Sequence, residues 1–377
     1  MSSDFRTYGI TDPNNTNLGD ISLYQAVCYL TESTDEYNGK LGARISSIFV
    51  IGIVSTLVTF FPVAAKRLPK LHIPLYVYLF ARYFGAGVIV ATAFIHLLDP
   101  AYGEIGPQTC VGLTPGWDQY SWPPALALLS LMFIFLMDLG ADVYVDRKYG
   151  IEHERENYEQ TMTGHRHQHD HASSSQVPEL EKPDSGGGGR NTTQKFEQQE
   201  EYNESNSIDE AARQQAVRQQ LAGFLILEFG VLFHSVIIGL NLGVAGDEFS
   251  TLYVVLIFHQ SFEGLGIGAR LSAIPFAKGS WVPWVLCSAY GLTTPIAISI
   301  GLGVRTTYNS GSFTANVVSG VLDSISAGIL IYTGLVELLA RDFIFNPQRT
   351  RNNRRLLFMV VCVVLGAGLM ALLGKWA

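Results

Sequence analysis

Charged residues are scarce in this sequence. Of its 377 residues, 15% are Asp, Glu, Lys or Arg and 48% are hydrophobic, and the mean hydropathy is positive. A soluble protein of this size normally carries about 25% charged residues. The charges that are present crowd into a few segments and leave long apolar stretches between them. The composition therefore excludes an ordinary soluble protein and indicates an all-α polytopic membrane protein.

Three familiar signals are also absent. The four cysteines show no CxxC spacing, which argues against a zinc finger or a redox motif. The first 40 residues are polar and lack the apolar stretch of a cleavable signal peptide, so the first membrane span is expected to target the chain. The His-Glu-x-x-His pattern of many zinc hydrolases does not occur. Function must therefore be sought in the membrane spans themselves.

Eight apolar stretches are long enough to cross a bilayer as helices, which takes about 20 residues each. They lie at residues 42–65, 74–98, 123–145, 220–244, 251–272, 281–303, 313–339 and 355–376. The sequence thus divides into a polar segment 1–40, three spans within 41–145, a loop 146–219 and five spans within 220–377.

Basic residues mark alternate loops, which predicts the orientation. The connections after the first, third, fifth and seventh spans hold Lys and Arg. Two of the other connections hold acidic residues, and Arg305 is the one basic residue among them. Because cytoplasmic loops carry the excess of Lys and Arg, both termini are predicted to be extracellular and the loop 146–219 cytoplasmic. The external connections would include Asp99 and Glu104.

The predicted cytoplasmic loop has too few apolar residues to fold on its own, so we expect it to be mostly disordered. Four alternating histidines in it could bind zinc weakly: His165, His167, His169 and His171. They would suit a sensor, a buffer or an acceptor of released metal, and a merely solvated loop is the alternative. The loop is also a candidate site for regulatory or trafficking proteins.

The fourth and fifth spans carry the strongest functional signal. His259 and Glu263 stand four residues apart, so they share one helical face inside the fifth span, where such residues are costly. His234 lies at a matching depth, because a short turn makes the two spans antiparallel neighbours. Two imidazoles and a carboxylate form a ligand set for zinc, with Ser235 and Gln260 as auxiliary groups. Interhelical hydrogen bonding is the alternative interpretation.

Further polar residues outline a path for a cation. His96 and Asp99 lie near the predicted outer end of the second span, and Asn241 shares the face of His234 on the outer side. Carboxylates that would bind a departing cation, accept protons or pair within the bundle are Glu228, Asp138, Asp142, Asp323 and Glu337. Arg82 is a candidate partner of one of these carboxylates.

The predicted external segments offer two covalent features. Cys28 and Cys110 both fall in them, so a disulfide between the two is allowed. Asn14 begins an Asn-x-Thr glycosylation acceptor on the same side. Cys287 and Cys362 are expected to be buried apolar residues.

The chain resembles the ZIP family of divalent metal transporters, and within it the fungal plasma-membrane zinc-regulated transporters. The resemblance rests on His234-Ser235 with Gly239 in the fourth span and on the run from His259 to Gly264 in the fifth. The stretches Ala91–His96 and Gly291–Pro295 support it. It implies a 3+2+3 arrangement of eight helices, a metal site in spans four and five, and frequent homodimers. It also implies an elevator-like movement of spans one, four, five and six against the others.

The chain departs from family members that hold two metals side by side. Ile238, one turn after His234, and Gln260, before Ser261, supply no carboxylate. We therefore expect one main site, with Zn²⁺ as the transported substrate and no prosthetic group. Such borderline ligands would also accept Fe²⁺, Mn²⁺ or Cd²⁺. The expected partners are metal ions and the lipid bilayer. No nucleic-acid partner is expected.

The favoured hypothesis is a multi-pass zinc importer of the plasma membrane, and not an enzyme. An intramembrane zinc hydrolase would also hold zinc with membrane histidines and keep a position for water. Against it, His96 is expected to lie too near the outer face to join the other two histidines. A metal-sensing receptor is a third hypothesis, supported only by the long cytoplasmic loop.

Overall fold

The computed structural model describes residues 21–33, 37–68, 74–149, 217–218, 220–277, 279–345 and 350–376. Within these ranges the chain forms helices joined by turns and contains no strand. Eight of the described helices are long and apolar enough to cross a membrane. The predicted all-α fold with eight spans is therefore confirmed.

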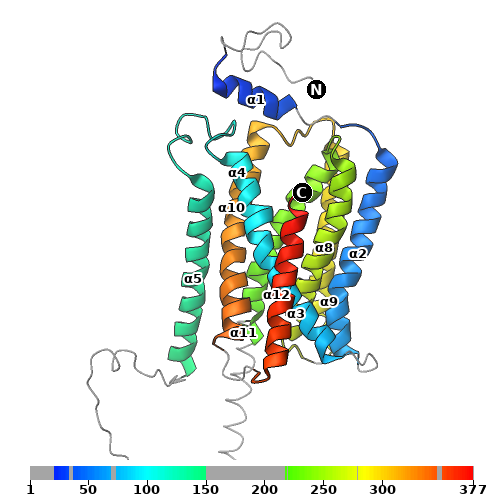
Figure 1. Cartoon of the computed structure of the whole chain (residues 1–377), viewed down its shortest axis with the longest axis vertical. Helices are drawn as coiled ribbons and strands as arrows, with labels where there is room; N and C mark the ends of the chain where they lie inside the picture. Colours follow the sequence, from blue (N-terminus) through cyan, green and yellow to red (C-terminus); the bar gives the residue numbers. More distant parts are fainter. Residues whose placement is uncertain are drawn as a thin grey trace, which may run out of the picture. The chain divides into compact units, whose positions relative to one another are not determined.

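The first helix, α1 (Leu23–Ser33), lies within the polar segment and was not predicted (Figure 1). The membrane spans that follow are α2 (Leu41–Arg67), α3 (Leu75–Ala91) continued by the π-helical segment Thr92–Leu98 and α4 (Asp99–Ile105), α5 (Trp122–Tyr149), the helix Gln220–Val244, α8 (Phe249–Ala273), α9 (Val282–Val304), α10 (Phe313–Tyr332) continued by the π-helical segment Thr333–Ala340 and α11 (Arg341–Phe343), and α12 (Asn353–Leu373).

The chain divides into two units, one formed by residues 1–137 with 220–377 and the other by residues 138–219. In the second unit the described residues are the last turns of α5 and residues 217–218. The predicted loop histidines and Asn14 lie outside the described residues. The contacts discussed below all belong to the first unit.

The two ends of the first unit differ in chemistry. Cys28 of α1 forms a disulfide with Cys110, the pairing that the sequence allowed, and we call this end the disulfide end. The opposite end, where α2 finishes with Lys66 and Arg67 and α11 begins with Arg341, is called the basic end. Because the chain crosses the unit eight times, α2 begins and α12 finishes at the disulfide end. The free cysteines Cys287 and Cys362 are buried, as predicted.

The spans of the first unit form two groups. In the ligand group, α2 packs on α8 and α9, and the helix Gln220–Val244 lies close against α9. Glycine permits this approach, since a Cβ on Gly239 would stand 2.7 Å from the Cβ of Ala297. In the flanking group, α3 packs along α12, and α4 with its π-helical segment packs on α10 (Figure 1). Ser130 of α5 joins α10 by a hydrogen bond to the Ile325 carbonyl, 2.9 Å long.

Apolar side chains cover the outside of the spans as well as their contacts. On α2, Phe49, Ile53 and Leu57 recur every four residues and are all exposed. Its opposite face buries Ser47 and Thr59, whose hydroxyls donate to carbonyls of their own helix. Small and polar residues inside, with large apolar residues outside, are the pattern that lipid selects.

The second span is longer than predicted. Asp99 and Glu104 were predicted to lie in an external connection, and this prediction is wrong, because both lie within α4. Pro100 does not stop the helix, because the π-helical segment directly before it already changes the backbone hydrogen bonds of the span. The π-helical segment before it widens one turn, a feature frequent at functional sites. His96 therefore lies nine residues, or roughly 14 Å, from the end of the span.

Candidate metal site

Three side chains of the ligand group converge at its centre. On α8, His259 Nε2 lies 3.3 Å from Glu263 Oε1, as expected for residues one turn apart. His234, on the helix Gln220–Val244, brings its ring centroid to 5.5 Å from that of His259. One ligand atom from each of the three lies within 4.8 Å of the others. The predicted set is thus brought together with the spacing that a single ion requires.

These three side chains are buried with their polar atoms unsatisfied. His234 is 2% exposed, and His259 and Glu263 are each 1% exposed. Among the described residues, their ring nitrogens and carboxylate oxygens have no hydrogen-bond partner. Because buried polar groups in folded proteins are nearly always paired, such a cluster indicates a site for a cation. This favours metal binding over interhelical hydrogen bonding.

Ser235 and Gln260 lie beside the three ligands. Gln260 Nε2 donates a hydrogen bond of 3.4 Å to Ser235 Oγ, and both side chains are buried. Tyr290 of α9 donates to the main-chain carbonyl of Gln260 and ties α8 to α9 at this level. Gln260 Oε1 has no partner among the described residues and is the group that could reach an ion. Their auxiliary role stays a prediction.

His96 lies at the site, so its predicted distance from the other histidines is wrong. Its ring packs edge-on against His259, with 4.6 Å between centroids, and it is 4% exposed. The error comes from the span, which continues past Leu98 to Ile105. His96 Nε2 lies 2.9 Å from the Met370 carbonyl and donates to it, which leaves Nδ1 with a free lone pair. A backbone carbonyl orienting an imidazole in this way is typical of metal ligands.

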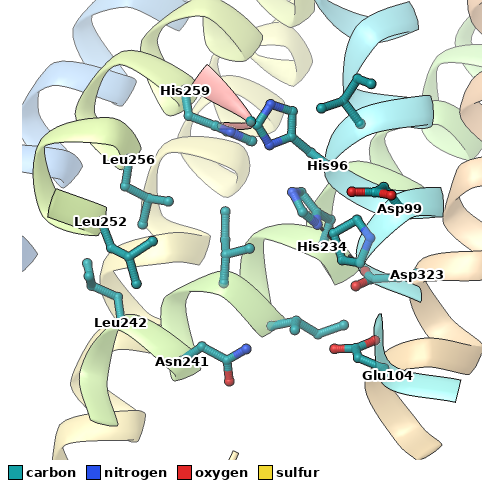
Figure 2. A pocket seen from close by; sticks show the side chains of 15 residues that line it. His96, Asp99, Glu104, His234, Asn241, Leu242, Leu252, Leu256, His259 and Asp323 are labelled. Atoms are coloured by element: carbon teal, nitrogen blue, oxygen red, sulfur yellow. Dashed lines mark ion pairs between the residues drawn. The ribbon is translucent and has the colours of Figure 1, made fainter. Parts of the chain in front are cut away.

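A cavity of about 250 Å³ extends from the three histidines toward the disulfide end (Figure 2). Asp323 of α10 lines it and places Oδ1 3.6 Å from His234 Nδ1. Asp99 and Asn241, both predicted to lie on the path, line it as well. Glu104 is a lining residue that sequence reasoning missed, because its position in a supposed loop concealed it. The carboxyl groups and the other polar groups of this lining suit a passage for cations.

The remaining predicted residues lie elsewhere. Glu228, six residues before His234 toward the basic end, is 3% exposed, and neither carboxylate oxygen has a hydrogen-bond partner among the described residues. Glu337 forms an ion pair with Arg270.

Arg82 pairs with Asp342 at 2.7 Å, so the prediction that it pairs with one of the candidate carboxylates is wrong. Arg82 lies near the basic end of α3, where α11 supplies the nearer acid. Asp138 and Asp142 belong to the second unit and stay predictions.

Eight apolar spans and a buried cluster of possible metal ligands at the foot of a cavity are the features of a multi-pass membrane transporter for metal ions. Comparison with known families makes this specific. The family model described as "ZIP Zinc transporter" matches residues 41–374, which is most of the chain. The chain therefore belongs to the ZIP family.

Individual relatives agree with this membership. Zinc-regulated transporter 1 of Saccharomyces cerevisiae is 59% identical over 91% of this chain and 89% of its own length. Zinc-regulated transporter 1 of Schizosaccharomyces pombe is 41% identical over 91% of this chain and 88% of its own length. Zinc transporter 3 of Arabidopsis thaliana is 30% identical over the same shares, 91% and 88%. These are transporters rather than enzymes, which leaves the hydrolase hypothesis without support, and a divalent metal ion is their substrate rather than a prosthetic group.

Proposed function

We propose that the protein imports Zn²⁺ across the plasma membrane, from the outside into the cytoplasm. The observation that carries this proposal is the buried, unsatisfied cluster of His234, His259 and Glu263 at the foot of a cavity. Nitrogen and oxygen donors in this combination suit zinc, and Fe²⁺, Mn²⁺ and Cd²⁺ are weaker candidates. Family membership and the zinc transporters among the relatives support the same substrate.

Two independent features support the proposed orientation. Disulfides persist in oxidising compartments, so the disulfide end faces the outside. The basic end then faces the cytoplasm, in agreement with the positive-inside rule. Both termini are extracellular in this arrangement, and the loop 146–219 is a cytoplasmic region that would bind metal or regulatory proteins. Homodimers, frequent in the family, are part of the proposal.

The path begins at Asp99, Glu104 and Asn241 in the cavity. The ion then meets His96, which completes four-coordination with His234, His259 and Glu263. His96 and Asp323 belong to the flanking group, whereas the other ligands belong to the ligand group. An elevator-like movement of the ligand group would therefore carry the ion away from two of its contacts. That loss weakens binding on the inner side and promotes release.

Glycines permit such a movement. Gly85 of α3 and Gly266 of α8 meet across the two groups, and a Cβ on Gly266 would lie 2.9 Å from the Gly85 Cα. Neither glycine has a side chain, so the two backbones meet directly at this point, next to the ring contact between Phe84 and Phe262. Release toward Glu228 and Glu337, which lie on the cytoplasmic side of the site, completes the cycle.

The test is uptake of radioactive zinc into zinc-starved cells that express the wild type, Glu263→Ala or His259→Ala at matched surface amounts. Saturable uptake in the wild type that disappears in both variants is expected. Equal uptake by all three proteins would show that the site is misassigned. No uptake above that of cells without the protein would overturn the proposed function.

A further inference from the structure

A buried ion pair lies between the metal site and the basic end. Arg270 Nη2 of α8 donates to Glu337 Oε2 of the π-helical segment Thr333–Ala340. The two side chains are only 13% and 10% exposed. Arg270 follows Glu263 by seven residues on the same helix, two turns and about 10 Å nearer the basic end. The pair therefore lies on the face that carries the metal ligands.

The ion pair joins the two groups of helices. Arg270 belongs to the ligand group, and Glu337 belongs to the flanking group through its continuity with α10. Glu337 also lies against the second ligand-bearing helix, since a Cβ on Gly223 would stand 3.0 and 3.2 Å from its carboxylate oxygens. A movement of the ligand group relative to α10 must therefore break or stretch this pair.

The described cavity extends from the metal site toward the disulfide end. Its lining includes Asn241 and Leu252, which lie on the disulfide side of the site. On the other side of His234, Leu227 and Val231 are fully packed, with 0% and 1% exposure. Beyond them stands the guanidinium of Arg270, whose positive charge repels a divalent cation. Packing and charge together close the inner route.

We propose that Arg270 and Glu337 form the inner gate of the transport cycle. While the pair is intact, it holds the ligand group in the outward-open position. The Arg270 guanidinium then pairs with the Glu337 carboxylate and prevents it from binding a metal ion. When the ligand group moves, the pair separates and Glu337 becomes free to bind the zinc ion that leaves the central site. Glu228, a buried carboxylate without a hydrogen-bond partner among the described residues, lies between the two positions. This inference rests on the proposed function.

The gate has a measurable consequence. Without the pair the outward-open state loses a stabilising contact, and its population falls. If that population falls to one tenth, the apparent affinity for external zinc falls about tenfold, because only the competent state binds. Access of outside reagents to the cavity falls by the same factor. A pair that merely holds the bundle together would lower the amount of folded protein instead.

The experiment measures both quantities in intact cells. Leu252→Cys places a thiol in the cavity, and its labelling by a membrane-impermeant thiol reagent reports the outward-open state. The native cysteines form a disulfide or are buried, so protein without Leu252→Cys supplies the background. The variants are Arg270→Gln, Glu337→Gln and the exchange Arg270→Glu with Glu337→Arg. Arg82→Gln is the matched control, because the Arg82–Asp342 pair joins two elements of the flanking group alone.

With surface amounts matched, each single variant is expected to label about tenfold more slowly and to show a KM for zinc raised about tenfold. The exchange should recover most of both quantities, and Arg82→Gln should match the wild type. Wild-type labelling in both single variants, equal slowing in Arg82→Gln, or an exchange no better than the single variants would overturn the gate. The labelling assay does not depend on zinc transport. Failure of the proposed function would appear as absent zinc uptake by the wild type, whereas failure of the gate would appear in the labelling rates of the variants.

Discussion

Replacement of His96 by alanine tests the arrangement in which a flanking helix supplies the fourth ligand. The ring of His96 touches that of His259, and its Nε2 is held by the Met370 carbonyl, so Nδ1 is the nitrogen that remains for an ion. The substitution removes this nitrogen and leaves the three ligands of the other group in place. Zinc should still bind and be transported, but it should be captured from the outside less tightly.

The size of the effect can be bounded. Loss of a residue that merely orients a ligand costs about 10- to 100-fold in metal affinity. A direct ligand should cost at least as much, so we expect KM to rise about 100-fold, equivalent to about 2.8 kcal/mol of binding free energy. Vmax should change little, because His96 does not travel with the ligand group.

The assay is the concentration dependence of radioactive zinc uptake at matched surface amounts. Ile95→Ala is the control, since Ile95 is adjacent, lines the same cavity and offers no ligand atom. A KM within twofold of the wild type in His96→Ala would refute the reasoning. Complete loss of uptake with normal surface expression would also refute it, because His96 would then be indispensable to the central site.

Three further predictions concern pH, stability and regulation. Uptake should weaken as the external pH falls from neutral to mildly acidic, because His234 and His259 bind zinc only as neutral imidazoles, and a KM that stays constant would contradict the site. Arg44 is fully buried and donates to the carbonyls of Leu242, Gly243 and Ala245. Arg44→Gln should therefore lower the free energy of unfolding by roughly 3 kcal/mol, measured as a lower Tm of the purified protein. An unchanged Tm would contradict a stabilising role for these hydrogen bonds. Deletion of residues 160–205 should leave zinc uptake largely intact and alter its regulation, whereas loss of all uptake would place the loop on the path.

The sequence predicted the central site because its signal is local. His259 and Glu263 share a helical face by spacing alone, and one short turn fixes the depth of His234 beside them. The eight spans are equally local, since each needs only its own run of apolar residues. The disulfide between Cys28 and Cys110 was allowed by the predicted orientation of the spans, which placed both cysteines on one side of the membrane. The spacing of the cysteines in the sequence did not require this pairing.

Other features depend on contacts between residues distant in the sequence. The continuation of the second span to Ile105 placed His96 at the site and Glu104 in the cavity, and neither apolar periodicity nor helix-capping rules detect the π-helical turn inside that span. The partners of Arg82 and Arg270 were likewise set by the packing of α3 and α8 against the span that contains Glu337 and Asp342. The order of residues determines which side chains share a helix, whereas the pairing of charges between helices is decided by the depth and rotation at which those helices pack.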